Sequence, residues 1–115
     1  MAYALRSPNG TGSGGNANTN GTGDISVTKP SGVANGDLLV VVIYAETAAN
    51  TVKTVPSGWT LAGSSTCSTE FVVRIYWKIA ASEGASWLWQ MNTTGAWATY
   101  AVAAFTGATG SGNFV

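Results

Sequence analysis

Two turn-and-strand cassettes constrain the fold of this chain more than any other feature of its sequence. The first runs from Pro30–Val33 through Asn35–Asp37 into the apolar run Leu38–Ala45. The second runs from Pro56–Trp59 into Thr60 and Leu61. Proline sets φ at the start of a turn, and glycine supplies a conformation that other residues avoid, so each cassette ends one strand and starts the next. This pattern predicts a compact antiparallel β-domain.

Apolar and polar residues alternate with the period of a β-strand, and the spacing of an amphipathic helix is nowhere sustained. The expected strands are Ile25–Lys29, Leu38–Glu46, Trp59–Ser65, Glu70–Ala80, a strand carrying Trp87 and Trp89, and Ala96–Thr106, with Thr47–Val55 as a polar loop. The nearly all-apolar Leu38–Glu46 is expected to be a central strand covered on both faces. Short strands separated by glycine and proline turns predict an all-β fold, an antiparallel β-sandwich or a jelly-roll-like barrel.

A low-complexity segment rich in glycine and asparagine occupies residues 9–23. It has little apolar surface to offset the entropy of ordering, which predicts an extended N-terminal arm over residues 1–23. The β-sandwich domain is then expected over residues 24–115. Two placements of the arm stay open: along the edge of its own sheet, or on a neighbouring subunit. In the second placement, the residues expected to contact the partner are Asn9, Asn16, Asn18 and Asn20.

The composition limits the classes of partner. The 115 residues fit one domain, and only 9% of them are charged, against about 25% in typical soluble proteins. Five basic and five acidic residues give a formal net charge of zero, which argues against binding to nucleic acid or to an anionic membrane surface. The longest apolar run is far shorter than the ~20 residues of a transmembrane helix. A neutral, charge-poor surface tends to associate, which suggests that partners cover part of it.

The residue types present offer little for catalysis. The chain has no histidine, which excludes Ser-His-Asp and Cys-His nucleophilic schemes and the commonest metal ligand. Its single cysteine, Cys67, cannot form a disulfide within the chain and is expected to be buried, the alternative being a disulfide between two chains. The five acids fall at turns and strand ends, where carboxylates are ordinary. We therefore expect no enzyme, no catalytic residue, no metal site and no cofactor.

Aromatic residues are the candidates for binding. The chain contains five tryptophans and four tyrosines, and exposed aromatic rings stack on the apolar faces of sugars. The candidates for a subunit interface or a glycan platform are Trp87, Trp89, Trp97 and Tyr76. The alternative is that these rings fill the core of the domain.

Four segments together resemble a β-sandwich domain of tailed-phage structural proteins. These are Ile25–Val42, Pro56–Leu61, Tyr76–Ala80 and Ala101–Gly107, in the same order and at similar spacing. The resemblance spans about residues 25–107 and rests on turn and core positions. It implies a non-enzymatic virion component, either a capsid decoration or head-fibre protein or a tail appendage, and it carries over no catalytic residue.

The resemblance also implies partners. Proteins of this type usually continue with further strands after the segment that corresponds to Ala101–Gly107, whereas this sequence stops at Val115. Either it is a shorter relative, or another copy of the chain supplies the missing sheet edge. This favours a homo-oligomer, with a trimer as the favoured state, and contacts with other virion proteins. The alternative function is a carbohydrate- or receptor-binding module of a tail fibre or bacterial surface protein, whose partner would be a host-surface glycan.

Overall fold

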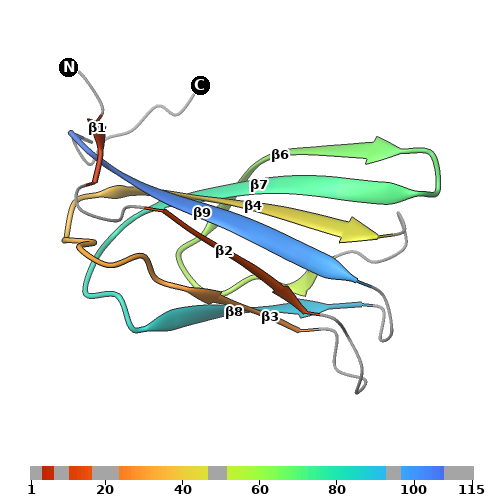
Figure 1. Ribbon diagram of the computed structural model, residues 1–115, viewed down its shortest axis with the longest axis horizontal. Coiled ribbons are helices and arrows are strands. Elements are labelled where there is room, and N and C mark those ends of the chain that lie inside the picture. The colour runs from red at the N-terminus through yellow and green to blue at the C-terminus, as the bar shows by residue number, and fades with distance from the viewer. Residues whose placement is uncertain (1–3, 7–10, 17–23, 47–51, 93–96, 108–115) are drawn as a thin grey trace.

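The chain forms two antiparallel sheets that pack face to face. The computed structural model describes residues 4–6, 11–16, 24–46, 52–92 and 97–107, and these contain nine strands and no helix (Figure 1). This arrangement confirms the predicted all-β sandwich.

The larger sheet has the strand order β1-β9-β4-β7-β6, and β2 also pairs with β9. Its strands are β1 (Ala4–Leu5), β2 (Thr11–Asn16), β4 (Leu38–Glu46), β6 (Thr60–Cys67), β7 (Phe71–Ile79) and β9 (Ala98–Thr106). Because β1 and β2 follow one another along the same edge of β9, the sheet is five strands wide. The predicted central position of Leu38–Glu46 is confirmed, since β4 lies between β9 and β7.

The smaller sheet has the order β3-β8-β5, formed by β3 (Ile25–Thr28), β8 (Ser86–Met91) and β5 (Val52–Thr54). The expected polar loop over residues 47–55 was wrong for β5, which pairs with β8 through Val52 opposite Met91 and Thr54 opposite Gln90. Three residues with one apolar side chain carry no alternation to detect. Pairing with a neighbouring strand, rather than side-chain pattern, makes this segment a strand.

Glycine conformations explain why both cassettes are turns. Gly36 and Gly58 have φ values of 90° and 84°, in the left-handed region that side chains with a Cβ avoid. At Gly58 a Cβ would also approach Nζ of Lys78 to 3.2 Å. The first turn is tied to the end of β7, because the amide of Gly36 donates to the carbonyl of Ala80 and the amide of Ala80 donates to the carbonyl of Asp37.

The core lies between the two sheets and contains the inward-facing side chains of both. Its buried members are Ile25, Val27, Leu39, Val41, Ile43, Ala45, Trp59, Val72, Tyr76, Ala80, Trp87, Trp89, Met91, Ala98, Tyr100, Val102 and Ala104. Trp59 packs edge-on against both Trp87 and Trp89, with ring centroids 5.2 and 5.1 Å apart. Edge-to-face geometry suits aromatic rings, so this cluster links the second cassette to the smaller sheet.

The N-terminal segment lies on the edge of its own sheet, which is one of the two placements left open by the sequence. β2 pairs along β9 from Thr11 opposite Ala103 to Asn16 opposite Ala98, and β1 continues on the same edge. Of the four candidate asparagines, Asn16 is the last residue of β2, whereas Asn9, Asn18 and Asn20 lie outside the described residues. The edge of β9 is therefore covered by this chain itself.

Candidate functional site: an uncovered apolar sheet face

Three of the four candidate aromatic residues lie in the core. Trp87 and Trp89 sit opposite Val27 and Ile25 and point into the sandwich, and Trp89 has no exposed surface. Tyr76 points into the core from the larger sheet and is buried there, and its ring lies 5.7 Å from that of Trp89. These three rings therefore fill the core, as the alternative interpretation predicted, because every second side chain of β7 and β8 faces inward. None of the three offers a ring face to a ligand.

Trp97 is the exposed member of the set. Its side chain is 58% exposed, and it precedes β9 at the end of the sheet where β4 finishes. The amide of Glu46 donates to its carbonyl at 2.8 Å, and its own amide donates to Oε2 of Glu46 at 3.4 Å. The exposed indole thus belongs to a residue whose backbone is held by two hydrogen bonds to Glu46, one of them to its carboxylate.

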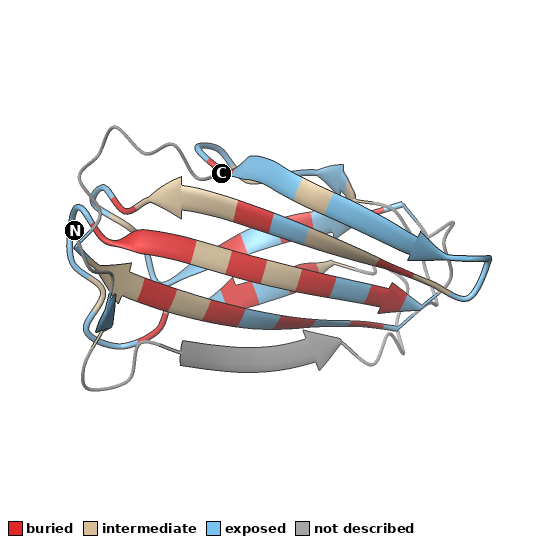
Figure 2. Cartoon of the chain, turned by 90° about the horizontal axis from the view of Figure 1, so that it is seen from above, coloured by how far each residue is buried: buried red, intermediate tan, exposed pale blue. Residues whose placement is uncertain are grey.

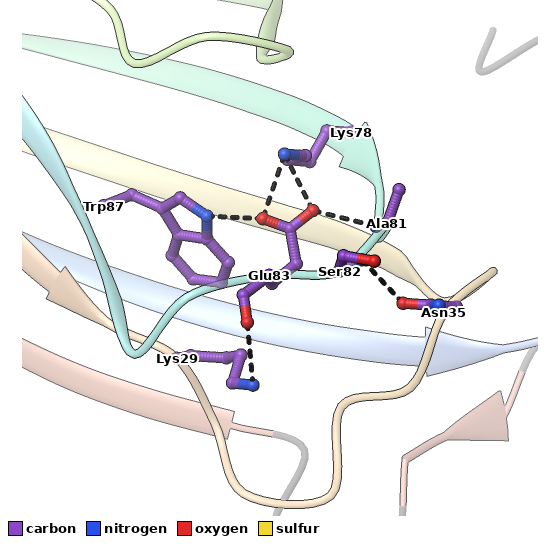
Figure 3. Close-up of polar contacts among 7 residues, drawn as sticks. All are labelled: Lys29, Asn35, Lys78, Ala81, Ser82, Glu83 and Trp87. Carbon is purple, nitrogen blue, oxygen red and sulfur yellow. Dashed lines mark hydrogen bonds and ion pairs between the residues drawn. The ribbon is translucent and has the colours of Figure 1, made fainter.

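The β7–β8 connection is held by Glu83 (Figure 3). Its carboxylate accepts hydrogen bonds from the indole of Trp87 at 2.8 Å and the amide of Ala81 at 2.9 Å, and it forms an ion pair with Lys78 at 2.8 Å. Burial raises the pKa of Glu83, but the bonds from Lys78, Ala81 and Trp87 outweigh it, so the pKa lies below its ordinary value. Nζ of Lys78 also lies 5.8 Å from the ring centre of Trp59.

A second carboxylate, Asp37, fastens the first turn. It forms a bidentate ion pair with the guanidinium of Arg6, in which Nε donates to Oδ2 at 2.8 Å, and Oδ2 also accepts from the amide of Ala34 at 2.9 Å. Burial raises the pKa of Asp37, but the bonds from Arg6 and Ala34 lower it by more, so the pKa lies below its ordinary value.

Both carboxylates stabilise the turns in which they lie. Each carboxylate accepts bonds from an amide and a cation, so its lone pairs are committed to the turns that it holds. Within the described residues, no group of three or more acidic, cysteine or histidine side chains could hold a metal ion. The described part of the chain also has no helix long and apolar enough to cross a membrane.

The outward-facing positions of three neighbouring strands form one continuous apolar surface, which we call the outer face. Its members are Leu38, Val40, Val42 and Tyr44 of β4, Phe71, Val73, Ile75, Trp77 and Ile79 of β7, and Ala101, Ala103 and Phe105 of β9. The antiparallel register aligns them in rows across the sheet, such as Ala101, Val42 and Ile75. Figure 2 looks onto this face, and no described strand lies over it.

Exposure differs along the outer face. Ile75 is 38% exposed and Tyr44 is 40% exposed, and the ring of Tyr44 lies 5.2 Å from that of Phe71. Leu38 is only 3% exposed although it does not belong to the core cluster between the sheets. The expectation that β4 is covered on both faces was therefore wrong. Its inner side packs in the core, while among the described residues only neighbouring side chains of the same sheet cover its outer side.

Charge is nearly absent from the outer face. Glu46 is the only charged side chain at an outward position of β4, β7 or β9, and it lies at the last position of β4. Arg74 and Lys78 of β7 sit opposite Ile43 and Leu39, which puts them on the inner side. Partners of the outer face would thus meet an apolar surface with one carboxylate at its rim.

Cys67 lies beside the outer face. It is a free, exposed thiol at the end of β6, opposite Phe71. The expectation of a buried thiol was wrong, because β6 is an edge strand and almost all of its residues are exposed.

The apolar pattern of two strands is a signal in the sequence for the outer face. β4 is apolar at both odd and even positions up to Ala45, and every odd position of β7 is apolar, although only one face of each strand can meet the smaller sheet. Comparison of the chain with protein families, with curated proteins and with solved structures finds no match. The outer face is therefore the strongest evidence on function in this molecule.

Proposed function

We propose that the chain is a non-enzymatic structural subunit of a tailed-phage virion, acting through contacts between subunits. The observation that supports this proposal is the outer face. Its three strands, about 4.8 Å apart and nine residues long, cover roughly 430 Å². The largest contiguous apolar patch on a soluble monomer is about 300–600 Å², and patches of this size often mark interaction sites.

The position within the virion is a capsid decoration or head-fibre protein, or a tail appendage. Support for this part comes from the resemblance of Ile25–Val42 and the later segments to phage β-sandwich domains. Those segments form β3, the first turn, the first five residues of β4, the second turn with the start of β6, and parts of β7 and β9. They contain parts of the three strands that carry the outer face and the turns that connect the strands of the sandwich. A subunit that assembles through this face needs these strands in a fixed position.

The test is the composition of purified particles. Mass spectrometry of gradient-purified particles of the phage that encodes the chain should find it at a copy number comparable with other structural proteins. Immunogold labelling with an antibody to the chain should then mark either the head or the tail. Presence of the chain in the lysate but not in purified particles would overturn the proposal.

A second candidate function is binding of a host-surface glycan at Trp97. The observation in its favour is the 58% exposed indole of a residue whose amide donates to the carboxylate of Glu46, since an aromatic ring and a hydrogen-bond acceptor are what a sugar needs. A glycan array with the wild-type chain and the Trp97→Ala variant tests it. Hits that vanish in the variant would support this function, and an array without hits would contradict it.

A further inference from the structure

We propose that the outer face binds the outer face of a second copy of this chain, about a two-fold axis parallel to β4. This inference rests on the proposed function, because it names the first partner of the surface that supports that function. The result is a dimer of sandwiches in which two five-stranded sheets pack against each other and the smaller sheets lie outside.

The size of the face fits such a contact. By strand spacing, the outer side of the whole five-strand sheet covers roughly 700 Å², close to the ~800 Å² per partner of a standard stable interface, and the outer face forms the apolar centre of this area with about 430 Å². A contact at the β9 edge is less suitable, because β1 and β2 already occupy it; a dimer formed instead at the exposed edge strand β6 would be unaffected by a charge at Ile75. Pairing through the face leaves those strands in place.

Side-chain size makes the face complementary to itself. On one side of β4, the middle of the face is small, with Ala101 and Ala103 of β9. On the other side it is large, with Ile75 and Trp77 of β7 in the same rows. A two-fold axis parallel to β4 exchanges the two sides, so in these two middle rows each large residue of one copy meets a small residue of the other, while in the end row Phe105 meets Ile79. Alternating large and small residues is how facing layers interdigitate.

The other in-plane two-fold axis fits less well. An axis perpendicular to the strands would place β7 over β7 and β9 over β9. Ile75 would then face the large residues of the same strand, and Ala101 would face small ones, leaving crowding on one side and a gap on the other. Shape therefore selects the axis parallel to β4.

Charge does not oppose the contact. The chain carries five basic and five acidic residues, so two copies have no net repulsion. With parallel strands, the two Glu46 carboxylates lie at the same end of the dimer. Both lie near the axis, because Glu46 ends β4, but Glu46 is at the rim and exposed, so both carboxylates stay in water, where their repulsion is screened.

The first experiment measures molar mass with a matched pair of variants. Light scattering of the wild-type chain should give twice the 11.7 kDa of one copy. Ile75→Lys places a charge at the centre of the face and should weaken dimerisation by about 100-fold or more, because the ammonium would be buried without a partner. The control is Leu88→Lys on the outside of the smaller sheet, where Leu88 is 48% exposed, and it should remain a dimer.

The second experiment tests the axis by exchanging sizes. Ala101→Ile alone crowds the partner's Ile75, and Ile75→Ala alone leaves a void, so each should weaken the dimer. The double variant Ala101→Ile/Ile75→Ala should restore it, because the large and small residues have merely changed sides. Circular dichroism and thermal melting of every variant check that each folds.

The outcomes separate the two proposals. A wild-type monomer, a trimer, or a dimer unaffected by Ile75→Lys would overturn the face-to-face inference. A dimer that the double variant does not restore would overturn the axis. A chain found in purified particles but monomeric in solution would overturn this inference alone, whereas a dimer absent from particles would overturn only the virion function.

Discussion

At the scale of single residues, Trp87 and Trp89 show how two side chains on one strand face can differ in what they stabilise. Both indoles are buried, but Nε1 of Trp87 donates to Glu83, whereas Nε1 of Trp89 has no hydrogen-bond partner within the described part of the chain. Trp87 therefore supports both the core and the β7–β8 connection, and Trp89 supports the core alone.

A double-mutant cycle measures this difference. We expect Trp87→Phe and Glu83→Gln to be coupled by about 1–2 kcal/mol in the free energy of unfolding, because a hydrogen bond to a charged acceptor contributes roughly that amount. The matched cycle of Trp89→Phe with Glu83→Gln should give a coupling near zero. Urea denaturation of the single and double variants gives both values, and equal coupling in the two cycles would contradict this role of Glu83.

What the sequence predicts at this scale is the strand face of a residue, not its exposure. Alternation correctly places Trp87 and Trp89 on one face of their strand, opposite Leu88 and Gln90. Whether that face meets a core or solvent depends on the second sheet, which local alternation does not encode. The same limit applies to Cys67, whose exposure follows from the edge position of β6.

At the scale of elements, β2 is the longest of the three strands, with β1 and β5, that sequence patterns did not predict. Its residues 11–16 read Thr-Gly-Ser-Gly-Gly-Asn, with no β-branched residue except threonine and with three glycines. Glycine weakens a strand, so pairing with the edge of β9 must supply what propensity lacks. By contrast, β3, β4, β7 and β9 were predicted nearly to their ends, because they alternate and are bounded by turns.

Removing residues 1–23 tests what this segment contributes. The deletion uncovers the edge of β9 and leaves the buried carboxylate of Asp37 without Arg6. We expect the melting temperature to fall by about 5 °C or more, which corresponds to roughly 1 kcal/mol for a domain of this size. Calorimetry measures this shift, and Arg6→Met in the full chain shows how much of it comes from the ion pair. An unchanged melting temperature would mean that β1 and β2 contribute nothing to stability.

At the scale of the whole molecule, the sandwich was predictable, but the outer face was not recognised as a surface. Both faces of the predicted strand Glu70–Ala80 carry aromatic residues, so alternation does not show which face meets the core. The pairing of β7 with β4 and the position of the smaller sheet decide this. Once these are known, Tyr76 belongs to the core and Trp77 to the outer face. Two of the few charged residues, Asp37 and Glu83, stabilise the first turn and the β7–β8 connection and do not lie on the outer face.

The pH dependence of folding follows from these two carboxylates. Bonds from cations and amides keep the pKa of Asp37 and of Glu83 below their ordinary values, so both acids ionise more readily in the folded chain than in the unfolded one. Their contribution to stability is fully present above the pKa of the unfolded chain, about 4, and is lost as the pH falls through the pKa values of the folded chain. We expect the free energy of unfolding to be level from neutral pH to about 5 and to decrease below about 4. Urea denaturation across this range measures the decrease. The Asp37→Asn/Glu83→Gln variant should be less stable at neutral pH and have a shallower acid slope, and an equal slope would show that other groups govern the acid transition.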